Sequence, residues 1–169
     1  MSDQIDQLLT VAEIGAAFAG FTAIAGAMLS DATIRVRSQI YFWIMIEFSC
    51  ALIIFSILPV VLFNFGLSDA MVWIAASTIM AVFIPCHIFG VGGKFIMPAV
   101  QRGEFAARGP WIFVPLFLVV FGVQTMNALG VGFDHTFGAY FLGLASFILL
   151  VFSNFVLLLI QFWKPGMDT

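Results

Sequence analysis

The feature that most limits the fold of this chain is a long apolar run near its start. The run, Leu8–Leu29, is rich in Gly and Ala and contains one carboxylate, Glu13. A helix needs roughly 20 mostly apolar residues to cross a bilayer, and this run is long enough. A spanning helix with so little side-chain bulk is expected to pack closely against another helix. Its carboxylate is expected to face protein or water and not lipid.

The composition assigns the chain to a broad class. Of 169 residues, 63% are hydrophobic and 9% are charged, whereas a soluble domain has about 25% charged residues. We therefore predict an integral membrane protein with the lipid bilayer as its main surroundings. The six basic residues form no patch, so no nucleic-acid partner is expected. The residues before Leu8 are acidic, unlike the basic leader of a signal peptide, so we expect the first run to be retained.

Five apolar stretches are predicted to be transmembrane helices. They are 8–29, 40–65, 70–91, 111–129 and 137–163. Ser68 or Asp69 is expected to cap the third helix, and Pro110 suits the first turn of the fourth. We predict an all-α, polytopic membrane helix bundle in which residues 1–169 form a single transmembrane domain.

The basic residues predict the orientation of this bundle. All six fall on one side of a five-helix arrangement: Arg35, Arg37, Lys94, Arg102, Arg108 and Lys164. Because Lys and Arg in short loops mark the cytoplasmic face, we expect the N-terminus outside and the C-terminus in the cytoplasm. Trp43, Trp111 and Trp163 are then expected near the cytoplasmic interface and Trp73 near the outer one. The connection 92–109 either continues the third helix or lies along the interface.

Polar residues inside the predicted helices fall at two depths, if each residue rises about 1.5 Å along its helix. The outer level holds Glu13, Gln124, Thr125 and Asn127, and the inner level holds Thr22, Glu47, His87 and Asn154. Each glutamate has two interpretations. It binds a cation or relays a proton, or it forms interhelical hydrogen bonds worth about 1 kcal/mol.

Glu13 stands on a face of the first helix that is made of small residues. Ala17, Gly20 and Ala27 share this face, with Ala16 and Ala23 at its edge. Small residues four apart allow the close approach of another helix. Two arrangements follow. Repeated around a symmetry axis, the face lines a pore with a ring of carboxylates, as in cation channels. Packed on the fourth helix of its own chain, it places Glu13 against Gln124 or Asn127.

Other chemistry is only weakly indicated. The chain has no catalytic triad order, no zinc-ligand spacing and no phosphate-binding loop, so we expect neither an enzyme nor a metal or cofactor site. His87 follows Pro85, which is expected to bend the third helix. A haem with His87 as its single axial ligand is a distant alternative. His135 is expected in an outer loop, too far from His87 to share a metal ion.

Three short segments resemble a loosely defined set of small five-helix bacterial inner-membrane proteins of unknown function. The segments are AAFAGF after Glu13, NALG at Asn127–Gly130 and YFLGL at Tyr140–Leu144. The resemblance implies a multi-pass protein of the cell inner (cytoplasmic) membrane. It implies no activity.

These observations leave two functional hypotheses. In the first, the protein is a small homo-oligomeric conduit for a monovalent cation or proton, with Glu13 at the outer constriction. In the second, it is a non-catalytic membrane subunit or scaffold that packs against another membrane protein through the small-residue face. The candidate ion-binding or pore residues are Glu13, Ala17, Gly20, Glu47, Gln124, Asn127 and Asn154, and the helix-packing residues are Ala16, Gly20, Ala23 and Ala27.

Overall fold

The computed structural model is all-helical over the residues that it describes, as predicted. It describes residues 2–28, 32–90 and 109–163, with side chains for 2–27, 42–90 and 114–160. These ranges contain five long helices: α1 (Ser2–Met28), α2 (Ala32–Asn64), α3 (Asp69–Cys86), α5 (Gly109–Leu129) and α6 (Phe137–Trp163). Four of them, α1, α2, α3 and α6, are long and apolar enough to cross a membrane, and the described apolar part of α5, Val114–Leu129, is shorter.

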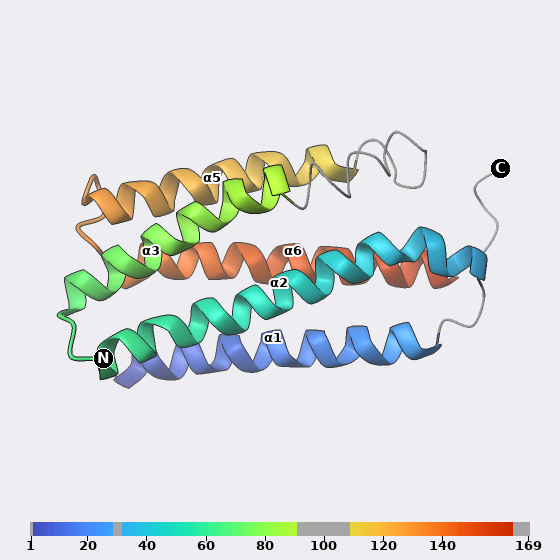
Figure 1. Ribbon diagram of the computed structural model, residues 1–169, viewed down its shortest axis with the longest axis horizontal. Coiled ribbons are helices and arrows are strands. Elements are labelled where there is room, and N and C mark those ends of the chain that lie inside the picture. Colours follow the sequence, from blue (N-terminus) through green and yellow to red (C-terminus); the bar gives the residue numbers. More distant parts are fainter. Residues whose placement is uncertain (1, 29–31, 91–108, 164–169) are drawn as a thin grey trace.

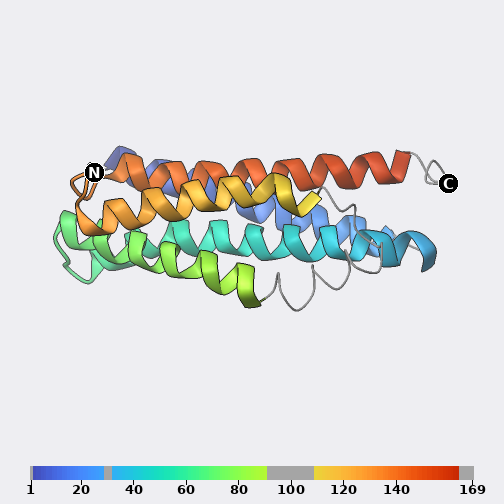
Figure 2. The same cartoon turned by 90° about the horizontal axis from the view of Figure 1, so that it is seen from above.

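The helices lie side by side along one long axis, and consecutive helices run in opposite directions (Figure 1). α1 packs mainly on α2, and α3 packs mainly on α5. α6 lies between these two pairs and contacts all four other helices (Figure 2). We call the end where α1 begins the Ser2 end, and the end where α6 finishes the Trp163 end.

Two helices extend beyond the apolar runs that predicted them. α1 begins at Ser2, and its first turn contains Asp3, a negative charge that suits the positive end of the helix dipole. α2 begins at Ala32, so Arg35 and Arg37 lie in its first turns at the Trp163 end and not between helices. An apolar run predicts the part of a helix suited to a membrane, and polar turns can extend that helix. The other four basic residues and most of segment 92–109 lie outside the described residues.

Glycines with positive φ end two of the helices. Gly66 (φ 80°) follows α2, and its N–H donates to Phe63 O at 2.9 Å. Gly130 (φ 69°) follows α5 in the same way, because glycine adopts this conformation without steric cost. Ser68 occupies the N-cap position of α3 without a side-chain capping hydrogen bond. Pro110 lies in the first turn of α5, as predicted.

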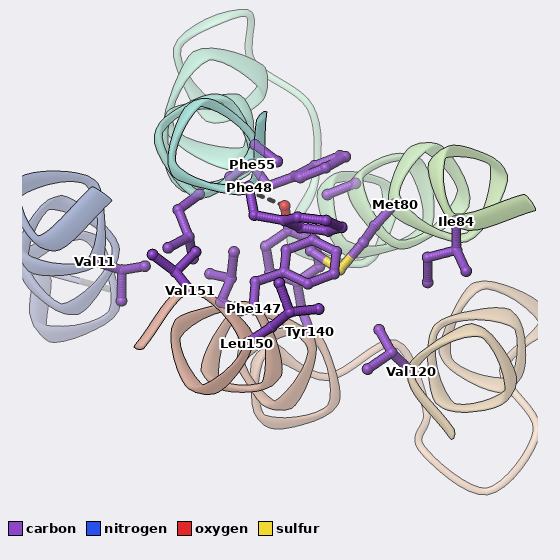
Figure 3. Close-up of a cluster of buried hydrophobic side chains, with 14 of the residues drawn as sticks. Val11, Phe48, Phe55, Met80, Ile84, Val120, Tyr140, Phe147, Leu150 and Val151 are labelled. Atoms are coloured by element: carbon purple, nitrogen blue, oxygen red, sulfur yellow. Dashed lines mark hydrogen bonds between the residues drawn. The ribbon is translucent and has the colours of Figure 1, made fainter. Parts of the chain in front are cut away.

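The core is a cluster of aromatic rings centred on Phe48 of α2 (Figure 3). Its ring centroid lies 6.2 Å from that of Phe83 on α3, 5.5 Å from Phe117 on α5 and 5.4 Å from Phe147 on α6. Aromatic pairs at such separations contribute about 0.5–1.5 kcal/mol beyond the burial of their area. One side chain therefore joins four helices.

Tyr140 provides a polar link between α6 and α2. Its fully buried hydroxyl donates to Phe55 O at 2.6 Å. In a regular helix the residue four positions later would donate to this carbonyl, but that residue is Pro59, which has no N–H. The tyrosine hydroxyl therefore supplies the hydrogen bond that the proline removes.

The aromatic belt is not formed as expected at Trp73. This side chain is only 3% exposed, and its ring packs on Phe63, Phe137 and Tyr140 at centroid distances of 5.4–5.7 Å. Trp73 lies in the first turns of α3, at the Ser2 end, but its side chain belongs to the core. Trp43, by contrast, is 64% exposed on the outer surface of α2.

α1 approaches α2 closely at Gly15, which was not among the predicted helix-packing residues. An ideal Cβ built on Gly15 would lie 2.9 Å from Ser49 O and 3.1 Å from both Leu52 Cβ and Ile53 Cγ1 of α2. At Gly20 it would meet nothing within 4 Å. The seam between α1 and α2 therefore uses the Gly15 side of α1 and leaves the predicted face uncovered.

Candidate functional site

Glu13 lies on the outer surface of the bundle. Its side chain is exposed, as are those of the small-residue face around it: Ala16, Ala17, Gly20, Ala23 and Ala27. α1 and α5 lie on opposite sides of the molecule (Figure 1). The expected intramolecular contact of Glu13 with Gln124 or Asn127 is therefore wrong, because α2 and α6 separate α1 from α5.

Asn127 has a structural role at the Ser2 end. Its side-chain N–H groups donate to Ser77 Oγ on α3 at 2.8 Å and to Thr136 O at 3.1 Å. Its Oδ1 accepts from the Thr136 backbone N–H at 2.8 Å. Its own carbonyl oxygen lies 2.7 Å from His135 Nδ1. The side chain thus ties α3 and α5 to the turn before α6.

Gln124, one turn earlier on α5, is fully buried, and only part of its side-chain amide is hydrogen-bonded. Its Nε2 donates to Ala139 O on α6 at 2.8 Å, whereas its Oε1 has no partner among the described residues. Gly143 makes room for it, because a Cβ there would lie 2.6 Å from both Gln124 Nε2 and Met80 Sδ. Gln124 therefore joins α5 to α6 close to the backbone. Thr125 is half-buried beside it.

Two polar residues of the predicted inner level bond to their own helices. Thr22 Oγ1 donates to Phe18 O at 2.7 Å, and Asn154 Nδ2 donates to Leu150 O at 2.8 Å. Both side chains are buried, and Asn154 Oδ1 has no partner among the described residues. Neither residue joins Glu47, so the inner level does not form a single cluster.

The other two residues of the inner level form a carboxylate–imidazole contact between α2 and the end of α3. His87 Nδ1 lies 2.7 Å from Glu47 Oε1. The side chain of His87 is 4% exposed and that of Glu47 is 25% exposed. In the described part of the chain no other contact joins a carboxyl group to a basic side chain within the apolar bundle. This pair is the strongest candidate site that the structure provides.

The local backbone of α3 presents His87 to α2. α3 is α-helical up to Cys86, and a wider π-helical turn continues through 87–90. The His87 N–H is shared between Phe83 O and Ile84 O. Pro85 lacks an N–H and disturbs the regular ladder just before this turn. Such π turns often occur at functional sites.

Three phenylalanine rings surround the imidazole of His87. Their centroids lie 4.7 Å (Phe48), 5.9 Å (Phe83) and 5.7 Å (Phe117) from the centroid of the imidazole. The described surroundings of the imidazole are therefore largely aromatic. Among the described residues there is no group of three His, Cys, Asp or Glu that would hold a metal ion.

Sequence reasoning placed Glu47 and His87 at one depth but did not pair them. The pairing depends on the rotation of each helix about its axis, which the apolar composition of α2 and α3 leaves open. The available signal was Pro85, two residues before a histidine in an otherwise apolar helix. A proline there marks a change in helical phase, and a buried histidine beside it needs a polar partner.

Fold and site together define, over the described residues, an all-α bundle of apolar helices with one carboxylate–imidazole pair in which the imidazole is buried. Comparisons with protein-family models, with curated proteins and with solved structures found no match for this chain.

Proposed function

We propose that the protein is a small multi-pass membrane protein that forms a homo-oligomeric conduit for a monovalent cation or proton. In this proposal five helices span the cell inner membrane, with the N-terminus outside and the C-terminus in the cytoplasm. The small-residue face of α1 lies towards the symmetry axis, and Glu13 of each copy contributes to an acidic ring at the outer constriction.

The observation that carries this proposal is the exposure of Glu13. Glu13 lies two residues after the buried Val11, within the apolar part of α1, and its side chain is exposed on the surface of the bundle. Ionisable residues inside a membrane face a protein interior or a water-filled cavity, because contact with lipid is costly. Since the described residues of its own chain leave Glu13 exposed, we expect a second chain or water to surround it. In a ring of carboxylates around an aqueous path, Glu13 contacts both a neighbouring chain and water.

The shape of α1 favours the same arrangement. At Gly20 an added Cβ would meet nothing within 4 Å, so the backbone there is open to a neighbouring molecule. Small residues at four-residue spacing permit close helix contacts in membranes. A bundle of five helices whose centre is filled by Phe48 and its neighbours has no room for an internal channel. A pathway at an interface between several copies of the chain does not have to pass through this filled centre.

Flux through proteoliposomes tests the conduit. We expect Glu13→Gln to reduce cation or proton flux at least tenfold, measured with an entrapped pH-sensitive dye under imposed K⁺, Na⁺ or pH gradients. Asp3→Asn is the matched control, because it removes the same charge from the exposed first turn of α1. Its flux should equal that of the wild-type protein. Wild-type flux in Glu13→Gln would reject the conduit.

A second function is favoured by the same uncovered face. The protein is then a non-catalytic subunit or scaffold, and α1 docks on a helix of a different membrane protein with Glu13 bonded across the contact. This alternative predicts no flux through the purified protein and a complex that contains a second kind of chain.

Native mass spectrometry from lipid nanodiscs separates the two functions. One closed stoichiometry of three or more identical chains supports the conduit, and a complex with another protein supports the subunit. We expect Gly20→Leu to disrupt either complex without unfolding the bundle. Gly122→Leu on α5 is the control, because a Cβ there also meets nothing within 4 Å. An intact complex in Gly20→Leu would exclude the α1 face as its interface.

A further inference from the structure

We infer that Glu47 and His87 form a binding site for a single proton between α2 and α3. This inference does not depend on the proposed conduit, since the two residues lie in the interior of one chain and not on the α1 face. It assigns to the pair a ligand, the proton, and two atoms that hold it, Glu47 Oε1 and His87 Nδ1.

The geometry suits a shared proton. The 2.7 Å separation of Oε1 and Nδ1 is that of a short, charge-assisted hydrogen bond. One proton lies between them, bonded either to the carboxylate oxygen or to the imidazole nitrogen. Its transfer from Oε1 to Nδ1 converts a neutral acid and a neutral imidazole into a carboxylate and an imidazolium. No other atom gains or loses a proton, and the net charge of the pair stays at zero.

The surroundings favour the state with one proton over the alternatives. A pair without the proton has a net charge of −1, and a pair with two protons has a net charge of +1. An uncompensated charge is costly to bury in apolar surroundings, and the rings of Phe48, Phe83 and Phe117 surround the imidazole. We therefore assign one proton to the pair, which keeps its net charge at zero.

No other described titratable group contacts the pair. On α2 and α3 the nearest in sequence are the exposed thiols of Cys50 and Cys86. The described part of α5 contains no titratable side chain. On α6 there is Tyr140, whose hydroxyl bonds to Phe55 O towards the Ser2 end. A change in the His87 ring signals on replacement of Glu47 therefore reports on this pair.

Access to the site is one-sided. Glu47 is 25% exposed, whereas the side chain of His87 is 4% exposed. Glu47 is therefore the more accessible partner of the pair, and His87 is the more enclosed one. Because Glu47 belongs to α2 and His87 to the π turn after α3, the contact also joins the end of α3 to α2.

Solid-state NMR of the full-length protein, labelled with ¹⁵N-histidine in lipid bilayers, tests the site. The chain has two histidines, so His135 is an internal control. We expect Glu47→Gln to displace the pH profile of the His87 ring signals by at least ~tenfold in proton concentration and to leave that of His135 unchanged. The amide preserves the size of the side chain but has no proton to transfer. An unchanged His87 profile would overturn the inference.

A second measurement guards against misfolding of the variant. Infrared difference spectra between high and low pH contain protonated-carboxyl bands from several of the nine Asp and Glu residues. We expect one of these bands to be absent from Glu47→Gln and present in the matched variant Glu13→Gln. Glu47→Asp retains a carboxyl group with one methylene less, and we expect its band at a shifted frequency. A full set of carboxyl bands in Glu47→Gln, with one band lost only in Glu13→Gln, would assign the proton to Glu13 and overturn the site.

Discussion

Tyr140 and Pro59 provide the sharpest test of how the bundle is held together. The Tyr140 hydroxyl donates to Phe55 O at 2.6 Å in a fully buried environment. Pro59 removes the N–H that would otherwise donate to this carbonyl. The hydroxyl of Tyr140 is needed because Pro59 cannot donate a hydrogen bond to this carbonyl. The contribution of Tyr140 should therefore depend on the residue at position 59.

The magnitude follows from the unsatisfied carbonyl. Tyr140→Phe keeps the ring in place and leaves Phe55 O without a donor, which costs about 1–3 kcal/mol in a buried site. Hydrogen bonds within membranes are often weaker, about 0.6 kcal/mol on average and about 1.7 at most, so we expect about 1–2 kcal/mol. In a Pro59→Ala background the helix supplies its own N–H to Phe55 O. Tyr140→Phe should then cost less than about 0.5 kcal/mol.

The assay is a double-mutant cycle of the free energy of unfolding. Each variant is unfolded by SDS titration in mixed micelles, and the fluorescence of the tryptophans, which include the buried Trp73, reports the transition. We expect a coupling energy of about 1 kcal/mol between Tyr140 and Pro59. An equal cost of Tyr140→Phe in both backgrounds would refute the reasoning, because the hydroxyl would then act independently of the proline.

Two further predictions concern the packing of α1 and the Ser2 end. Gly15→Ala should be about 1–3 kcal/mol less stable than Gly20→Ala in the same SDS titration, because both gain helix propensity and only Gly15 places a Cβ 2.9 Å from Ser49 O. Equal stabilities would exclude the tight seam. Asn127→Ala should cost about 1–2 kcal/mol and speed hydrogen exchange at the Thr136 N–H, since that group loses its acceptor. Unchanged exchange at Thr136 would contradict this role.

The helices were predictable because their signal is additive over many residues. Apolar runs bounded by Gly66 and Gly130 locate the ends of α2 and α5 to within a residue or two, and the structure agrees. The early starts of α1 and α2 were missed. The polar turns that extend these helices, which include Arg35 and Arg37, have no apolar signal.

The candidate site was harder to predict because it depends on helix rotation. The sequence indicates that Glu13 and Glu47 lie at different depths, but depth alone does not select their neighbours. One predicted arrangement placed Glu13 in contact with the fourth helix, but α2 and α6 lie between α1 and α5. Gly15 was overlooked because a glycine in an Ala- and Gly-rich helix reveals its contact only when the partner helix is known.

The central position of α6 has a consequence for the order in which the protein is made. Ribosomes release α6 after the other four helices, yet α6 contacts all of them. Until it inserts, Phe48 lacks the ring of Phe147, and Phe55 O lacks the hydroxyl of Tyr140. Until α6 is made, the α1–α2 and α3–α5 pairs therefore meet mainly through the packing of α2 on α3. The last helix of the chain completes the joint between the two pairs.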